Sequence, residues 1–203
     1  MTNVILFVDF WNFQLSWRDN VRPEKGSGKS HVSIAWKDLP GILISELPTV
    51  FGSTASLDYK GTRIYASVSS GTGGKDVGLK NFLHQTLGQM TGFNVEVRDR
   101  KPKSTDCPHC KKTIWRSVEK GVDASIITDL FSRALNDAYD VAIVISNDSD
   151  LVPAVKVIQD RLNKQIIHIG FTHGGHHMRT ASWGHIVLDG KVADKLKLEE
   201  TTA

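Results

Sequence analysis

Two carboxylates follow a buried strand in the C-terminal half of the chain. The stretch VAIVISNDSDL places Asp148 and Asp150 directly after the apolar run Val141–Ile145. Asp9 likewise ends an apolar run near the N-terminus, in the stretch VILFVD. Because the carboxyl ends of parallel strands share one edge of a sheet, and ligands bind at that edge, we expect these three side chains to lie close together.

A further carboxylate comes from a helix that we predict over residues 121–136. Its first turn lies at the same edge, since the helix precedes the strand that ends at Ser146. Four of its residues share one helical face at spacings of four, three and four: Asp123, Ile127, Leu130 and Ala134. We therefore expect the Asp123 carboxylate at the tip of an apolar stripe that faces the sheet.

Carboxylates brought together in this way would repel one another without a cation. Hard divalent ions such as Mg²⁺ and Mn²⁺ prefer oxygen ligands, and acidic sites hold them together with substrate phosphates. Such an ion activates water and stabilises charge on an attacked phosphodiester. The predicted metal ligands are Asp9, Asp123, Asp148 and Asp150.

Two of these acids also have a simpler explanation. Asp150 could cap the next helix, with Pro153 accommodated in the first turn, and Asp123 could complement a helix dipole. For Asp150 alone, capping is the favoured interpretation. The group as a whole favours a metal site, because no basic residue stands beside Asp9 or Asp148.

Strands and helices alternate along the chain. The predicted strands are 4–8, 63–69, 93–100, 141–146, 165–171 and 185–189. The predicted helices are 36–50, 76–90, 121–136, 150–163 and 176–183. This alternation implies parallel pairing through right-handed crossovers, hence a three-layer α/β fold with an open parallel sheet and helices on both faces.

Length and composition fit one globular domain. We expect it over residues 1–190, with polar excursions at 18–31 and 101–116, followed by a charged C-terminal tail at 191–203. Two cysteines among 203 residues exclude a disulfide-built scaffold. The N-terminus lacks a basic segment before its short apolar run, and no stretch is long enough to span a membrane, so we expect a cytoplasmic protein without membrane association.

Three motifs occur in the order found in a known family. FVDFWN (7–12), EKGVDASIITDL (119–130) and VISNDSDLVPAV (144–155) resemble the NYN domain, a PIN-like nuclease family that includes LabA-like proteins. The usual family forms are close to D-x-x-N, K-G-V-D and S-G-D-S-D-F. The closing segment at 165–189 also resembles the end of the family's domain. The resemblance implies a PIN-like, Rossmann-like sheet and a Mg²⁺- or Mn²⁺-dependent ribonuclease.

The resemblance also implies roles for individual residues. Five positions match its acidic metal-binding site: Asp9, Asn12, Asp123, Asp148 and Asp150. Ser146 matches the hydroxyl before the acidic pair, whereas Asn147 stands where the family often has Gly, and Leu151 where it often has Phe. Asp129 matches a further acid of the family, but it lies about 120° around the helix from Asp123. We expect Asp129 to be a structural partner rather than a ligand.

A basic segment precedes Asp123. Residues 98–120 hold eight basic side chains against three acids, which suits a nucleic-acid backbone, although charge runs are often only solvated faces. The residues predicted to contact RNA are Lys101, Lys103, Lys111, Lys112, Trp115, Arg116 and Lys120, with Trp115 offering a stacking surface. Trp11 could stack on a base or pack in the core, and the sequence leaves both open.

The stretch CPHC has the spacing of half a zinc site. Cys107 and Cys110 would need two further ligands, and the chain holds no other cysteine. The candidates are His109 and the distant His173, His176 and His177, and a thiol hairpin without metal is the favoured reading. GSGKS (26–30) imitates a P-loop but does not follow a buried strand, so we expect a loop there, as for SSGTGGKD (69–76).

We therefore predict a metal-dependent ribonuclease, with endonucleolytic cleavage expected and RNA favoured over DNA by the resemblance alone. The alternative is a non-catalytic NYN module that binds RNA or a protein. A phosphatase of the haloacid dehalogenase type would need an acid at position 11, where Trp11 stands. The oligomeric state, a homodimer included, stays open.

Overall fold

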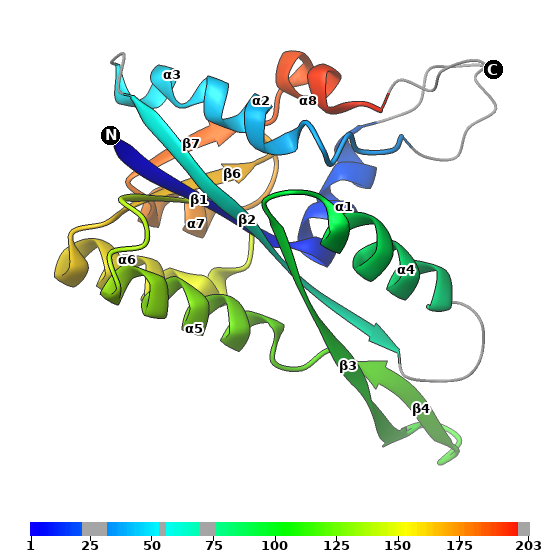
Figure 1. Ribbon diagram of the computed structural model, residues 1–203. Helices are drawn as coiled ribbons and strands as arrows, with labels where there is room; N and C mark the ends of the chain where they lie inside the picture. The colour runs from blue at the N-terminus through cyan, green and yellow to red at the C-terminus, as the bar shows by residue number, and fades with distance from the viewer. Residues whose placement is uncertain (22–31, 53–55, 70–75, 199–203) are drawn as a thin grey trace, which may run out of the picture.

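The computed structural model describes residues 1–21, 32–52, 56–69 and 76–198. These residues form a seven-stranded sheet in the order β4-β3-β2-β1-β5-β6-β7 (Figure 1). The strands are β1 Thr2–Asp9, β2 Leu57–Ser69, β3 Phe93–Asp106, β4 Thr113–Val118, β5 Val141–Ile145, β6 Gln165–Gly170 and β7 Gly184–Val187. Neighbouring strands from β3 to β7 pair in parallel, and β4 pairs antiparallel with β3.

Helices cover both faces of this sheet, which confirms the predicted three-layer α/β fold. The α-helices are α1 Phe10–Asn20, α2 Leu39–Glu46, α3 Pro48–Phe51, α4 Val77–Asn81, α5 Val122–Leu135, α6 Val152–Leu162, α7 His176–Ala181 and α8 Gly190–Leu196. Short turns of other helix types occupy Phe82–Thr86 (η1), Leu87–Gln89 (η2) and Ser149–Leu151 (η3). None of these helices combines the length and the apolar character needed to cross a membrane.

The central strand β1 is buried on both faces because its alternate residues enter two separate cores. Val4, Leu6 and Val8 belong to a core with residues of α1, α2 and α8. Ile5 and Phe7 belong to the other core, with residues of α5, α6 and α7. The continuous apolar run in the sequence follows from this arrangement, since a strand between two helical layers has no solvent-facing side.

The direction of the crossover connections reverses between β1 and β5. These strands are neighbours, but the chain leaves β1 through α1 on one face and leaves β5 through η3 and α6 on the other (Figure 1). This is the switch point of the sheet, where open α/β folds bind their ligands. Helix α5 leads into β5, so its first turn lies at the same edge.

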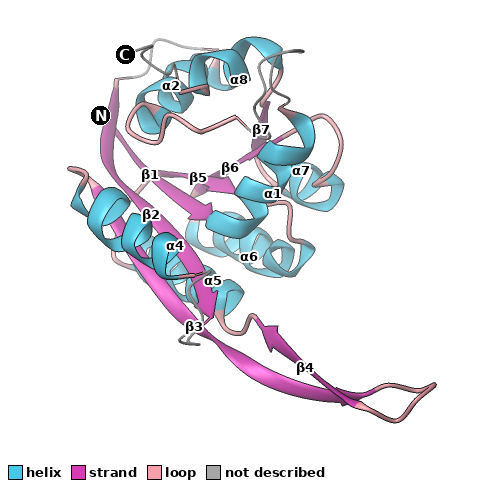
Figure 2. Cartoon of the chain, turned by 90° about the vertical axis from the view of Figure 1, so that its right-hand side faces the viewer, coloured by secondary structure: helices cyan, strands magenta, loops and turns pink. Residues whose placement is uncertain are grey.

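The predicted polar excursion at 101–116 contains regular structure that the sequence did not indicate. Its residues form the outer half of β3 and most of β4, a hairpin that extends away from the helices (Figure 2). The alternation of apolar and polar residues is absent because neither face of this hairpin is covered by a helix. Of the other excursion, 18–20 belong to α1, and 22–31 lie outside the described residues.

The predicted charged tail is wrong for residues 191–196. They belong to α8, and three of its side chains are buried in the core: Val192, Ala193 and Leu196. The Asp189 carboxylate caps this helix, accepting from the backbone N–H groups of Lys191 at 3.0 Å and Val192 at 3.1 Å. The short apolar stripe lies between charged residues, which explains why composition alone suggested a tail. Residues 199–203 lie outside the described residues.

Candidate active site

Asp9 occupies the junction between β1 and α1. Its carboxylate caps α1 by accepting the Asn12 backbone N–H at 3.1 Å, and the Ser146 hydroxyl donates to it at 3.2 Å. The residue is only 5% exposed. Burial raises the pKa of Asp9 to about 6, and the negative charges of Glu119 and Asp123 act in the same direction. Among the described residues, the partners of this buried carboxylate are thus a backbone N–H and a hydroxyl rather than a basic side chain.

The end of β5 is organised around Ser146. The Ser146 hydroxyl oxygen accepts the backbone N–H of Asp148 at 3.2 Å while its own hydroxyl contacts Asp9. The Asp148 carboxylate caps the following turn, accepting the backbone N–H of Asp150 at 2.8 Å. The proposed capping role of Asp150 is therefore wrong: Asp148 is the cap, and Asp150 is exposed one turn before α6.

Asn12, at the start of α1, and Asn147, just after β5, hold these two segments together. The Asn12 side-chain oxygen accepts the backbone N–H of Asn147 at 2.9 Å. The Asn147 amide donates to Ser16 at 3.1 Å, and its oxygen lies 3.2 Å from Nε2 of the buried His168. A β-carbon at Gly175 would lie 2.2 Å from that oxygen, so the glycine provides the space that the larger Asn147 needs.

Asp123 lies in the first turn of α5 and faces the same group of charges. Burial raises its pKa, and the charges of Asp148, Glu119 and Asp150 raise it further. Asp123 is thus the acid that interacts electrostatically with the three others, Asp9, Asp148 and Asp150, which come from two further segments. Their function as a catalytic site stays a prediction.

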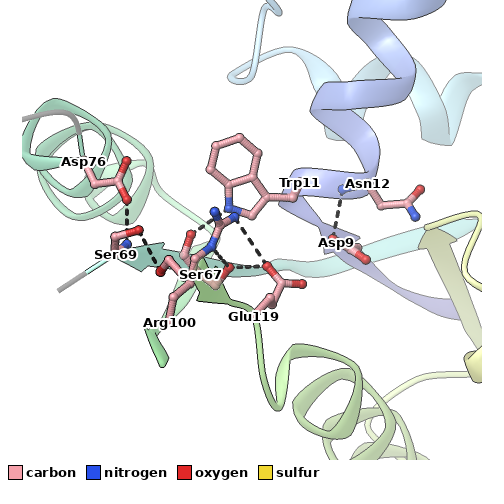
Figure 3. A network of polar contacts seen from close by, with 9 residues as sticks. Asp9, Trp11, Asn12, Ser67, Ser69, Asp76, Arg100 and Glu119 are labelled. Atoms are coloured by element: carbon pink, nitrogen blue, oxygen red, sulfur yellow. Dashed lines mark hydrogen bonds and ion pairs between the residues drawn. The ribbon is translucent and has the colours of Figure 1, made fainter. Parts of the chain in front are cut away.

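Glu119 is a residue of this site that the sequence did not single out. The Ser67 hydroxyl donates a short hydrogen bond to its carboxylate, and Arg100 lies 3.7 Å away (Figure 3). The Arg100 guanidinium also donates to Ser67 at 2.9 Å and lies 4.9 Å from the centre of the Trp11 ring. One signal could have revealed Glu119: it precedes Asp123 by four residues at the edge where α5 begins.

Trp11 packs within the protein, one of the two alternatives that the sequence left open, and its stacking on a base stays a prediction. Its indole N–H donates to the Ser67 carbonyl at 2.6 Å, and its ring packs edge-to-face on the buried Phe10. The Arg100 guanidinium also lies over this ring. Trp11 is therefore fixed beside the carboxylates by the sheet and the core together.

The donor set fits a hard divalent cation in chemistry, but the described carboxylates are not arranged as a ready-made cage. The pKa values of Asp9 and Asp123 are raised by burial and by neighbouring carboxylates, and among the described residues no basic side chain forms an ion pair with either. Within residues 1–21, 32–52, 56–69 and 76–198, however, no three His, Cys, Asp or Glu side chains are grouped closely enough to hold a metal ion.

Asp129 is a structural partner, as expected. Its carboxylate accepts from the Arg63 guanidinium at 2.8 Å, from Arg133 at 2.9 Å and from the Tyr65 hydroxyl at 2.5 Å. The hydroxyl and the two guanidinium groups hold the pKa of Asp129 below its usual range, although burial opposes them. The cluster ties α5 to β2 on the side of the helix away from the strand ends.

The predicted RNA-binding residues do not form one patch. Ser104 pairs with Trp115 across the hairpin, so Lys101 and Lys103 lie on the opposite face from Trp115. Arg100 shares the Trp115 face by the same alternation. Lys111 and Lys112 are exposed at the hairpin tip, and Lys120 is exposed just before α5. In the structure the backbone of Arg116 pairs with that of Lys103.

The two cysteines are free thiols at the tip of the β3–β4 hairpin. His173, His176 and His177 lie next to or within α7, between β6 and β7, at the other edge of the sheet. The sheet order therefore argues against these histidines as partners of the thiols. The P-loop-like stretch 26–30 and residues 70–75 lie outside the described residues, and Ser69 and Asp76, which flank 70–75, are joined by a 2.6 Å hydrogen bond.

The NYN domain model matches residues 49–187 of this sequence, which include Asp123, Asp148 and Asp150. The chain belongs to the NYN domain family. Membership gives it a nuclease-like fold of the PIN-like superfamily, whose nucleases generally use divalent metals. Asp9 and Asn12 precede the matched region, yet the sheet places them beside the matched acids.

A solved structure shares this NYN fold over nearly the whole chain. A crystal structure of a protein of unknown function from Vibrio parahaemolyticus superimposes with a TM-score of 0.60 at 19% identity, covering 97% of this chain and 96% of that one. The likeness concerns the fold alone. No curated protein sequence matches this chain.

Proposed function

We propose that this NYN protein is a divalent-metal-dependent ribonuclease that cleaves RNA at the ends of β1 and β5. One observation carries the proposal: carboxylates from three segments raise one another's pKa at the switch point, and among the described residues no basic side chain pairs with Asp9 or Asp123. Such an arrangement destabilises the free protein, and a bound cation relieves it. Acidic sites of this kind hold Mg²⁺ together with phosphate oxygens.

Asp9, Asp123 and Asp148 would hold the cation, with Asp150 at the exposed rim. When bound, the ion would lower the pKa of water and stabilise charge on the phosphodiester. The Ser146 hydroxyl orients Asp9 and fixes the backbone at Asp148. Asn12 keeps α1 against the end of β5, which sets the spacing between Asp9 and Asp148.

RNA would approach along the hairpin face that carries Arg100 and Trp115. Trp115 is 69% exposed and lies four residues of strand beyond Arg100, or about 13 Å at the usual rise of a strand. Arg100 stands beside Glu119 and Trp11, next to the carboxylates. A single strand could thus stack a base on Trp115 and pass its backbone over Arg100.

The competing function is RNA or protein binding without cleavage. It is favoured by the absence, within the described part of the chain, of three metal-binding side chains already grouped together. A catalytic protein must draw its carboxylates inward when it binds the cation. A binding module has no such requirement.

The deciding experiment compares cleavage of a labelled single-stranded RNA in Mn²⁺, in Mg²⁺ and in EDTA. We expect metal-dependent cleavage, and we expect Asp148→Asn to lower its rate by about 10²-fold or more. Asparagine is also a good helix cap, so this variant keeps the turn that Asp148 begins.

Asp160→Asn is the matched control, because Asp160 is exposed on α6 away from the strand ends. It should cleave at the wild-type rate. RNA binding without cleavage by the wild-type protein in either metal would instead support the binding module.

A further inference from the structure

The tip of the β3–β4 hairpin has the backbone of a zinc knuckle, meaning here the turn formed by residues 107–112. The Cys107 N–H donates to the Lys112 carbonyl at 2.9 Å, and the Lys111 N–H donates to the Cys107 carbonyl at 2.9 Å. Lys111, directly after Cys110, has a left-handed φ of 56°. A lysine adopts this conformation at a cost of about 1 kcal/mol or more, so the turn is held in shape by its hydrogen bonds.

This backbone aims donors at one of the two sulfurs. The backbone N–H groups of Cys110 and His109 are directed at the Cys107 sulfur. Metal ligation requires the thiolate, and N–H groups directed at a sulfur favour that form. The pair is therefore prepared as two ligands of a tetrahedral ion.

The chain supplies only half of such a site. Structural zinc takes four ligands, and Cys107 and Cys110 are the only cysteines of the sequence. The histidine group at 173–177 lies at the far edge of the sheet. His109 lies within the turn itself and adds at most one ligand, so the site is incomplete without a second molecule.

The shape of the hairpin leaves its tip accessible to a second molecule. Its outer half extends beyond the helical layers, with the knuckle at its end (Figure 2). Cys110 is exposed, and near the tip the apolar side chain of Ile114 is 42% exposed. Two such tips can meet without contact between the bodies of the two molecules.

We propose that two copies of this chain bind one Zn²⁺ between their hairpin tips through Cys107 and Cys110 of each. Four thiolates around Zn²⁺ carry a net charge of −2. Lys111 and Lys112 of the two copies together bring four positive charges to the same place. These lysines would repel one another without the metal, and the negatively charged zinc–thiolate group attracts them. The carboxylates at the strand ends take no part.

The test titrates the full-length, reduced protein with Zn²⁺ in a thiol-free reductant and follows bound zinc and molecular mass. We expect saturation at about half an equivalent of zinc per chain and a mass that doubles with it. The double variant Cys107→Ser/Cys110→Ser should stay monomeric and bind no zinc at this stoichiometry. Because both thiols lie at the exposed tip, its circular dichroism should match the wild type.

His109→Ala separates a four-thiolate site from one that uses imidazole. It should keep the zinc stoichiometry and the dimer. One zinc per monomer, loss of zinc in His109→Ala, or a dimer that survives both chelation and the double cysteine variant would each overturn the proposal. RNA cleavage is not part of the readout, so the result is independent of the proposed nuclease activity.

Discussion

Helix α5 carries two aspartates with opposite surroundings. Asp129 accepts from Arg63, Arg133 and Tyr65, and its pKa is lowered. Asp123, six residues earlier, faces other carboxylates, and its pKa is raised. The same helix thus places one acid among groups that neutralise its charge and the other among carboxylates that repel it.

The two aspartates show that some charge stabilises this fold, as at Asp129, whereas other charge, as at Asp123, lowers its stability. A carboxylate with two guanidinium partners strengthens the contact between α5 and β2. The group formed by Asp9 and Asp123 lowers stability in the absence of a cation, and such unrelieved charge is typical of functional sites.

The largest effect should appear when each aspartate of α5 is changed alone. Asp123→Asn should lower metal-dependent RNA cleavage by about 10²-fold or more, because it removes a proposed metal ligand. Asp129→Asn should leave the rate within about threefold of the wild type, since its partners lie away from the strand ends. Single-turnover rates at saturating Mn²⁺ provide the measurement, and equal losses in both variants would contradict the contrast.

Asp9→Asn should stabilise the metal-free protein near pH 7. The pKa of Asp9 is raised to about 6, so the folded state favours the protonated acid. The stability that this group contributes is complete below about pH 4 and is lost as the pH rises through about 6. A shift of about two units corresponds to about 3 kcal/mol at most.

Urea unfolding of the wild type and of Asp9→Asn at several pH values measures this gain. The advantage of the variant should be near zero at pH 4 and should reach its full size above about pH 6. His168, whose pKa burial lowers to about 4, titrates in both proteins and cancels in the difference. An advantage that is independent of pH would rule out ionisation of Asp9 as its source.

Asp129→Ala should destabilise the protein by about 2 kcal/mol, because it leaves the Tyr65 hydroxyl and the half-buried Arg63 without their acceptor. Thermal unfolding should then begin about 4–8 °C lower. Asp160→Ala, an exposed change on α6, should have little effect under the same conditions. A comparable loss in both would show that the cluster contributes nothing specific.

The smallest expected effect concerns the hairpin. Trp115→Ala should weaken binding of a single-stranded RNA by about 5–20-fold, the usual worth of one stacked base. Lys103→Ala, on the opposite face, should change affinity by less at moderate salt. Filter binding with Asp148→Asn as the common background avoids cleavage, and a larger effect from Lys103 than from Trp115 would place RNA on the other face.

The sequence predicted the fold class, the family and the edge at which the acids would meet. These rest on local patterns: apolar runs in β1 and β5, the helical period of α5, and acids placed directly at strand ends. The same reasoning misplaced the helix cap at Asp150 and overlooked α8, whose apolar stripe is three residues. It also treated residues 101–116 as featureless, because an uncovered hairpin shows no alternation of apolar and polar residues.

What the sequence determined by itself, then, is which residues stand at the ends of buried strands, because burial on two faces requires continuous apolar runs. Only the tertiary structure decided which acids are neutralised and which are not. Glu119 joins the carboxylates because β3 brings Arg100 and β2 brings Ser67 beside it, whereas Asp129 is separated from them because β2 also supplies its partners Arg63 and Tyr65. These contacts join residues up to 66 positions apart, and electrostatic interaction depends on distance in space rather than along the chain.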